Sequence, residues 1–223
     1  MRHLSRRIGK GMGMTSERTR NRLLDRLRGS GISDESVLQA MEAVPRHLFV
    51  DEALASRAYE DISLPIGYGQ TISQPFVVAL MTQAMLEDGL PERVLEVGTG
   101  CGYQTAILAC LVDEVYTIER ILELHRLARS RVFEMGLRNV KFRYGDGFEG
   151  WSDNAPYDAI LAAAAPRQTP QKLLDQLSVG GRIILPVGGA GGQKLLKIVR
   201  TEDGFEKKEL ESVHFVPLVS GTT

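Results

Sequence analysis

Short runs of β-branched and other apolar residues alternate with segments of helical spacing between residues 93 and 189. The apolar runs read RVLEV, EVYTIE, VKFRYGD, YDAILAAAA and GGRIILPVG, and helical stretches such as ILELHRLARSRVFEM lie between them. Strands separated by helices join through βαβ crossovers, which produce a mostly parallel sheet covered by helices. The alternation therefore predicts a doubly wound α/β sheet, in which ligands bind at the carboxyl ends of the strands.

Different patterns flank this sheet. Before it, helical spacing predicts helices over residues 16–28 and 33–44, one or two helical turns over 46–61, the loop ISLPIGYGQTIS and a helix beginning near Pro75. After it, KLLKIVRTEDGFEKKELESVHFVPL lacks helical spacing and contains an EDG turn. We therefore expect added N-terminal helices and an antiparallel C-terminal edge.

The chain of 223 residues, 43% of them hydrophobic, suits one domain with a substantial core. We assign residues 16–223 to it, with helices and a substrate loop over 16–92 and a ligand-binding sheet over 93–223, and residues 1–15 to a flexible basic extension. The net charge of −1 gives no general attraction to nucleic acid or anionic lipid. The arginines near the N-terminus suit a solvated helix face behind a loose tail, although a nucleic-acid-binding arm has a similar composition.

Cysteine and histidine usage limits the metal and redox chemistry of the chain. Its two cysteines, Cys101 and Cys110, form no CxxC pair, and its four histidines have no metal-ligand spacing. No apolar stretch in the sequence approaches the roughly 20 residues that span a bilayer. We expect reduced thiols, no metal site, no membrane span and a cytoplasmic location.

The first strand of the sheet leads into a helix through a glycine-rich loop, VLEVGTGCGYQTAILA. The loop lacks the lysine of a phosphate-binding P-loop, and Tyr103 replaces the last glycine of the dinucleotide motif G-x-G-x-x-G. Glu96, Gly98, Gly100 and Gly102 form the spacing E-x-G-x-G-x-G, which resembles the glycine loop of S-adenosylmethionine-dependent methyltransferases. A carboxylate at this place would repel a pyrophosphate and favour a cation such as a sulfonium.

Two further strands end in residues suited to the rest of that cofactor. Glu119 ends EVYTIE, where an acid accepts hydrogen bonds from ribose hydroxyls. The next strand ends in GDG, where Asp146 is placed to accept from an adenine amino group and Gly147 leaves space for the ring. Each acid alone has an ordinary interpretation as a strand-end or turn residue. Features at three successive strand ends together predict an S-adenosylmethionine site.

A second set of segments carries a narrower resemblance. VPRHLFV, LPIGYGQTISQP, VLEVGTGCGYQTAILA, GDG, APYDAILAAAAP and GGRIILPVG resemble segments of the protein-L-isoaspartate O-methyltransferase family. The resemblance runs from about Leu23 to Leu218, and GQTISQP is its specific element. It implies a Rossmann-like methyltransferase fold that uses S-adenosyl-L-methionine and releases S-adenosyl-L-homocysteine. It also implies methylation of the free α-carboxylate of L-isoaspartyl residues in damaged proteins, after which the ester collapses to a succinimide that partly reopens to aspartate.

The same resemblance implies roles for residues of GQTISQP. Thr71, Ile72 and Ser73 would lie across the cofactor from the glycine loop, and Ser73 matches the family's active-site serine. We expect its hydroxyl to orient the acceptor carboxylate, although Ser73 could also cap the helix that follows. Val219 stands where some members have a hydroxyl residue, and we leave it out of the site. The expected protein is a monomer that acts on isoaspartyl proteins and peptides, without nucleic acid or membrane.

The implied acceptor agrees with the residues at the end of the fourth strand. A carboxylate with a pKa of about 4 is already ionised at neutral pH, so its methylation requires positioning and no base. The strand runs into AAAAPRQTP and carries no Asn-Pro-Pro-Tyr-type tetrad of an amine methyltransferase. A methyltransferase for small molecules or nucleic acid and a nicotinamide-binding protein remain the alternatives.

Overall fold

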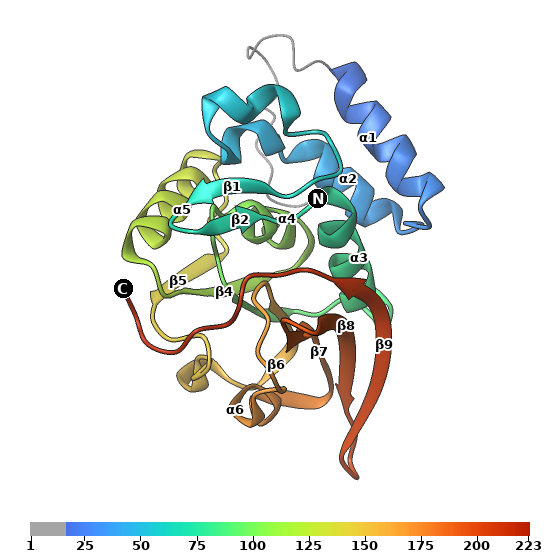
Figure 1. Cartoon of the computed structure of the whole chain (residues 1–223). Coiled ribbons are helices and arrows are strands. Elements are labelled where there is room, and N and C mark those ends of the chain that lie inside the picture. The colour runs from blue at the N-terminus through green and yellow to red at the C-terminus, as the bar shows by residue number, and fades with distance from the viewer. Residues whose placement is uncertain (1–16) are drawn as a thin grey trace.

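The computed structural model describes residues 17–223, so the basic extension predicted over residues 1–15 lies outside the described part. A seven-stranded sheet has the order β5-β4-β3-β6-β7-β8-β9 (Figure 1). Its strands are β3 (Arg93–Val97), β4 (Glu114–Glu119), β5 (Val140–Tyr144), β6 (Tyr157–Ala162), β7 (Leu177–Gly189), β8 (Gly192–Arg200) and β9 (Phe205–Val213). The helices are α1 (Glu17–Gly29), α2 (Glu35–Ala43), α3 (Pro75–Leu86), α4 (Tyr103–Leu111), α5 (Leu122–Glu134) and α6 (Gln171–Leu174).

The direction of the strands confirms the doubly wound sheet and its antiparallel edge. Strands β3 to β7 pair in parallel, whereas β7, β8 and β9 pair antiparallel. Strand β3 pairs with both β4 and β6, so the order of the strands reverses beside it. This reversal is the topological switch point, and the glycine loop begins where β3 ends.

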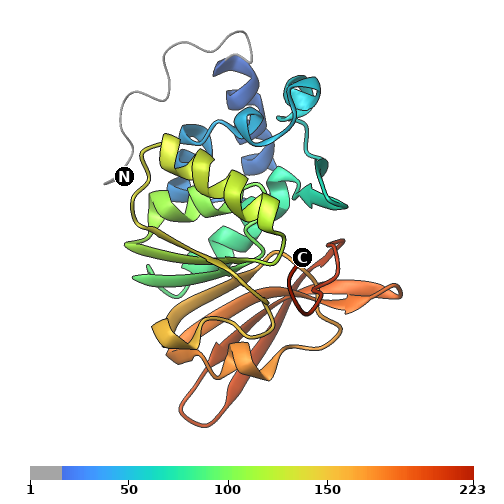
Figure 2. The ribbon, with the colours of Figure 1, turned by 90° about the vertical axis from the view of Figure 1, so that its left-hand side faces the viewer.

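Helices cover the two faces of the sheet unequally. Helices α3, α4 and α5 pack on one face, and the single turn of α6 packs on the other (Figure 2). Side chains alternate along each strand, so Val94 and Val115 join the core beneath the three helices while Leu95 and Tyr116 join the core on the opposite face. Burial on both faces explains why the parallel strands read as nearly continuous apolar runs.

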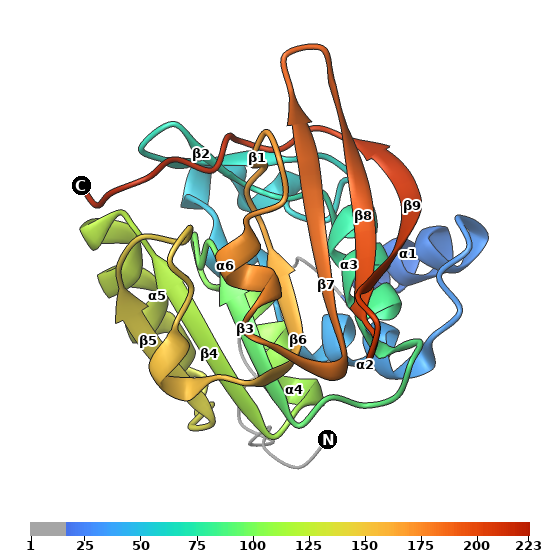
Figure 3. The same ribbon diagram turned by 90° about the horizontal axis from the view of Figure 1, so that it is seen from below.

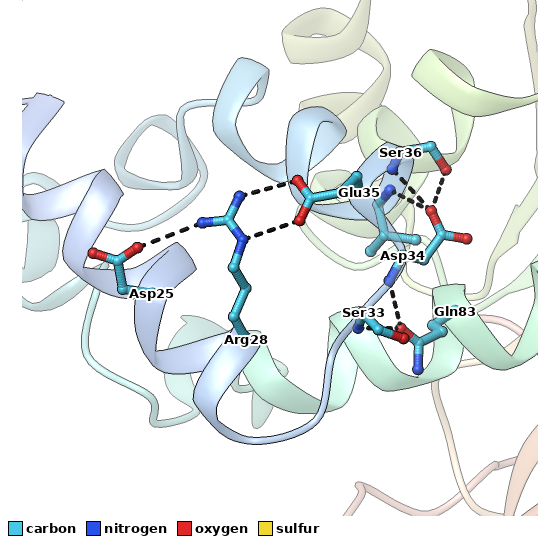
Figure 4. A network of polar contacts seen from close by, with 8 residues as sticks. Asp25, Arg28, Ser33, Asp34, Glu35, Ser36 and Gln83 are labelled. Atoms are coloured by element: carbon cyan, nitrogen blue, oxygen red, sulfur yellow. Dashed lines mark hydrogen bonds and ion pairs between the residues drawn. The ribbon is translucent and has the colours of Figure 1, made fainter.

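The two N-terminal helices form an outer layer against α3 and α4. A polar network ties this layer together, as Figure 4 shows. Arg28 of α1 donates to both carboxylate oxygens of Glu35, at 3.1 and 3.0 Å. Asp34 caps α2 by accepting from the backbone N–H of Ser36, and Gln83 of α3 accepts from the N–H of Asp34. The cap is therefore Asp34, one residue after the predicted start of this helix.

Of two predictions about the segment before α3, the loop requires correction and the helical turns are confirmed. The stretch predicted as a loop contains an antiparallel hairpin of β1 (Leu64–Gly67) and β2 (Gln70–Ile72). Its tip has positive φ at both Tyr68 (54°) and Gly69 (67°), as in the tight turns that join twisted strands. The helical turns predicted over 46–61 are two 3-10 helices, η1 (Arg46–Phe49) and η2 (Glu52–Arg57). None of the helices in residues 17–223 combines the length and apolar character of a membrane span.

Candidate active site

A pocket opens at the carboxyl ends of β3, β4 and β6. We call it the loop pocket; its volume, including its open mouth, is about 950 Å³. Its walls come from the glycine loop after β3, the end of β4, the β1–β2 hairpin and residues 216–219. The pocket therefore lies at the switch point, where doubly wound sheets bind ligands.

A second pocket, which we call the edge pocket, adjoins the first. Much of its wall is formed by residues 191–194, around the start of β8, and by residues 212–216, around the end of β9. Its volume, including the open mouth, is about 1250 Å³. Both pockets are lined by Thr71, Ser73, Ala163 and Val216. A group held at this shared boundary can face ligands in both pockets.

The three glycines of the glycine loop have left-handed backbone conformations but serve two different purposes. Gly98 (φ 92°) and Gly100 (φ 55°) line the loop pocket. Gly102 (φ 91°) instead faces α5, where a Cβ atom would lie 3.2 Å from the Cβ of Ala128. The first two glycines shape the pocket, and the third permits close packing of α4 on α5.

Glu119, at the end of β4, lies on the loop pocket and holds the glycine loop in place. Its side chain is buried, with 5% of the residue exposed. One carboxylate oxygen accepts from the backbone N–H of Gly100 at 2.8 Å, and the other accepts from that of Ile121 at 3.0 Å. Since each carboxylate oxygen can accept more than one hydrogen bond, Glu119 keeps acceptor capacity for a ligand.

Glu96 does not reach the pocket, and the electrostatic role predicted for it requires correction. The residue is fully buried between the sheet and α4, where its Oε2 atom accepts from the hydroxyls of Thr105 at 2.5 Å and Thr117 at 2.6 Å. Burial raises the pKa of the Glu96 carboxyl to about 8, although both hydroxyls act in the opposite direction. The group is therefore mostly neutral at pH 7 and presents no negative charge to a sulfonium. Thr117 also lies 2.6 Å from the hydroxyl of Thr99, which links Glu96 to the glycine loop.

Asp146 and Gly147 follow β5 and differ in what they contact. Asp146 is not among the residues that line the loop pocket; its two oxygens accept from the backbone N–H groups of Phe148 at 2.8 Å and Gly221 at 2.6 Å. Gly147 lines the pocket, and a Cβ atom there would lie 2.5 Å from Cγ1 of Val97. Gly147 therefore provides the predicted space, whereas Asp146 holds the C-terminal segment.

Ser73 lies between β2 and α3, where the two pockets meet. Its side chain is half-buried, and its hydroxyl has no hydrogen-bond partner within residues 17–223. The cap of α3 is Gln74, without a side-chain cap bond, so the capping role considered for Ser73 is wrong. Thr71 lines both pockets and the buried Ile72 lines the loop pocket. Thr71, Ile72 and Ser73 therefore line the same loop pocket as Gly98 and Gly100 of the glycine loop.

The C-terminal segment supplies a wall that the sequence interpretation missed. After β9 the chain crosses the carboxyl end of the sheet toward α5 (Figure 3). Ala165 donates to the carbonyl of Val216 and accepts from the N–H of Leu218, and Leu122 donates to the carbonyl of Thr223. Val219, which we had left out of the site, lines the loop pocket. No local pattern in the sequence indicated this position, because the hydrogen bonds that hold the segment join residues distant in the chain.

Comparison with known proteins identifies the family to which this site belongs. Residues 18–223 match the family model described as protein-L-isoaspartate(D-aspartate) O-methyltransferase. The chain belongs to this family. Among curated protein-L-isoaspartate O-methyltransferases, that of Halorhodospira halophila is 59% identical over 215 residues, covering 96% of this chain and 98% of the relative. That of Pseudomonas paraeruginosa is 58% identical over 208 residues, covering 93% of this chain and 99% of the relative.

Solved structures of the family have the same fold. A protein-L-isoaspartate O-methyltransferase structure superimposes with a TM-score of 0.81 and 29% identity, over 89% of this chain and 65% of that chain. A structure from Plasmodium falciparum, named for the same activity and in complex with S-adenosyl-L-homocysteine, has a TM-score of 0.79 and 26% identity, over 90% of this chain and 98% of that chain. The Rossmann-like methyltransferase fold expected from the sequence is confirmed.

Proposed function

We propose that this protein transfers the methyl group of S-adenosyl-L-methionine to the free α-carboxylate of L-isoaspartyl residues in damaged proteins and peptides. The observation that carries the proposal is the position of Ser73, whose hydroxyl has no partner in the described part of the chain and stands where the loop pocket meets the edge pocket. One pocket has the features of a cofactor site, and the other opens along the edge of the sheet. Membership of the protein-L-isoaspartate O-methyltransferase family supports the assignment.

The residues of the loop pocket fit S-adenosylmethionine. Gly98 and Gly100 keep the loop free of side chains, and Gly147 keeps space beside Val97 that a methyl group would fill. Glu119 offers carboxylate oxygens, which suit the hydroxyls of a ribose. The charged residues that line the loop pocket are Glu119 and Arg120, and the Arg120 side chain donates to the carbonyl of Gly221 at 3.0 Å. S-adenosylmethionine, when bound, supplies a methyl group already activated by the positive charge of its sulfonium.

Ser73 acts on the acceptor and not as a nucleophile. Since an α-carboxylate is ionised at neutral pH, no base has to remove a proton from it. The Ser73 hydroxyl donates a hydrogen bond to this carboxylate and orients one oxygen toward the loop pocket. A neutral donor suits the reaction because the carboxylate loses its charge as it is methylated, and a strong cation would favour the ground state instead.

The other predicted residues form walls of the site or act on it through neighbouring groups. Thr71 and Ile72 form the wall opposite the glycine loop, and Gly102 sets the packing behind it. Glu96 acts through the hydroxyls of Thr117 and Thr99. Asp146 accepts a hydrogen bond from Gly221 and so fixes the C-terminal segment, which forms one wall of the loop pocket. We further propose that the protein works as a cytoplasmic monomer, a location that its two buried, unpaired cysteines support.

A paired assay tests the proposed function. Purified protein is incubated with radiolabelled S-adenosylmethionine and either an isoaspartyl peptide or the same peptide with a normal aspartyl residue. Label should enter the isoaspartyl peptide alone, and equal labelling of both peptides would reject the acceptor. Calorimetry with S-adenosylhomocysteine and NAD separates the methyltransferase from a nicotinamide-binding protein, and label found in added RNA or DNA would favour a nucleic-acid methyltransferase. Light scattering measures the mass in solution and tests the monomer.

A further inference from the structure

The chain continues past the last residue pair that β9 makes with β8. Gln193 pairs with Val213, and β8 begins at Gly192, so the backbone of β8 offers no further partner to the residues after Val213. The side chain of Gln193 extends the pairing instead. Its Nε2 donates to the carbonyl of Phe215 at 3.0 Å, and its Oε1 accepts from the N–H of Phe215 at 2.7 Å. One amide thus satisfies both backbone groups of Phe215, as a paired strand residue would.

The segment held in this way separates the two pockets. Residues 214–216, which we call the wall segment, line the edge pocket, and Val216 also lines the loop pocket. Its far end is fixed by the backbone N–H of Ala165, which donates to the carbonyl of Val216 at 2.8 Å. Gln193 and Ala165 are therefore the two anchors of a short stretch of chain that faces the same boundary as Ser73.

We infer that Gln193 is a positioning residue for the methyl acceptor: its amide fixes the wall segment against which the substrate peptide binds. This inference rests on the proposed function. A displaced wall segment fits the substrate peptide less well, so loss of the anchor nearest the edge pocket weakens binding of the acceptor. The loop pocket keeps its glycine loop and Glu119, and Ala165 still holds Val216 there, so the affinity for the methyl donor depends little on Gln193.

The chemistry of the amide allows a sharp test, because Glu and Leu remove different parts of it. In Gln193→Glu the carboxylate still accepts from the N–H of Phe215 but repels the carbonyl oxygen to which Gln193 donates. Protonation of that carboxyl restores the donor, and a hydrogen bond made only by the neutral form raises its pKa. Gln193→Leu removes both hydrogen bonds at every pH.

Other charged groups near the amide do not obscure this comparison. On β8, Lys194 pairs with Glu209 of β9 at 2.6 Å and donates to Ser212, while His214 lies on the wall segment itself. The part of β7 opposite Gln193 is glycine, at Gly188. These groups are present in the wild type and in both variants, so each variant is compared with the wild type at the same pH.

The experiment measures KM and kcat for an isoaspartyl peptide, with saturating S-adenosylmethionine, at about pH 5 and about pH 8, which lie on either side of the titration expected for the introduced carboxyl. For Gln193→Leu we expect KM of the peptide to rise about tenfold at both pH values, which is the effect of about one hydrogen bond lost between the peptide and the displaced wall segment. For Gln193→Glu we expect the same rise at the higher pH and recovery toward the wild type at the lower pH. The dissociation constant for S-adenosylhomocysteine should stay within about twofold of the wild type in both variants, which also shows that they are folded.

Gln171→Leu and Gln171→Glu are the matched controls, since Gln171 is exposed on α6 and, within residues 17–223, its side-chain amide hydrogen-bonds to Asp175 alone. They should leave KM unchanged. An unchanged KM in both Gln193 variants, or a rise in Gln193→Glu that does not recover at low pH, would overturn the inference. If Gln193→Leu does not fold, the two pH values measured on Gln193→Glu alone decide. A wild type that labels no isoaspartyl peptide would instead refute the proposed function.

Discussion

Replacement of Glu96 by glutamine should change how the stability of the protein depends on pH. The folded carboxyl titrates at about 8 and its ordinary pKa is 4.5, and the first cause of the difference is burial. Between these two values the unfolded chain has released the proton while the folded chain still binds it. The unfolded state then binds fewer protons, so the stability of the wild type falls as the pH rises across this window. Glutamine does not titrate and avoids this loss.

The expected size of the effect follows from the width of that window. Each pH unit in which only the unfolded carboxyl is ionised costs about 1.4 kcal/mol. Between about pH 5 and about pH 8, the stability of Glu96→Gln relative to the wild type should therefore increase by about 3 kcal/mol. The amide oxygen of glutamine can still accept from Thr105 and Thr117, and any fixed cost of the new NH₂ group is the same at every pH.

Urea unfolding, followed by the fluorescence of Trp151, measures this difference at several pH values within the window. Glu123→Gln, at an exposed position in the first turn of α5, is the matched control and should follow the wild type closely. Parallel stability curves for Glu96→Gln and the wild type would show that Glu96 is already ionised in the folded protein. That result would refute the neutral carboxyl on which the corrected role of Glu96 depends.

Three further substitutions test the site and its support. Ser73→Ala should lower kcat for an isoaspartyl peptide by about tenfold or more, as for a lost hydrogen bond to a charged group. The affinity for S-adenosylhomocysteine, measured by calorimetry, should not change. An equal loss of kcat and of this affinity would contradict the role of Ser73 toward the acceptor. Glu119→Gln should weaken S-adenosylhomocysteine binding in calorimetry by about tenfold, since a neutral acceptor replaces a charged one, and full affinity would remove Glu119 from the cofactor site. Lys197→Met should lower the free energy of unfolding by about 2 kcal/mol, because the buried ammonium lies 2.8 Å from both Glu87 and Asp88. Urea unfolding measures this change. Because the two acids are partly exposed, a change below about 0.5 kcal/mol would show that solvent already screens these ion pairs.

The sheet was predictable because its signals are local. Alternating apolar runs and helical spacing define each strand and helix within a few residues, and the crossover rule then gives parallel pairing. The glycine loop, Glu119 and Gly147 were found for the same reason, since each directly follows a strand. Their meeting at one pocket follows from parallel strands ending at the same edge of the sheet.

The errors arose where a residue's partner is distant in the sequence or where composition misled. The glycines and proline around Tyr68 read as a loop, although the same residues permit the tight turn of a hairpin. Glu96 stands next to the glycine loop, yet the period of two in a strand turns it to the same face as Val94, toward Thr105 of α4. That alternation could have indicated its burial.

The C-terminal wall could not be found from local patterns. The contact between Asp146 and Gly221 joins residues 75 positions apart. Neither residue has a sequence neighbour that indicates the other, and turn residues such as Asp146 more often bond to their own backbone. Only the folded sheet places the end of β5 beside the chain that follows β9.

The wall made by residues 216–219 affects when this protein becomes able to work during its synthesis. The glycine loop, the strand ends and the β1–β2 hairpin all leave the ribosome before that wall does, because they precede it in the chain. A nascent polypeptide can therefore assemble most of the sheet while the donor pocket still lacks one side. A product of interrupted translation that stops before Val216 contains the residues of every strand of the sheet but lacks one wall of the loop pocket.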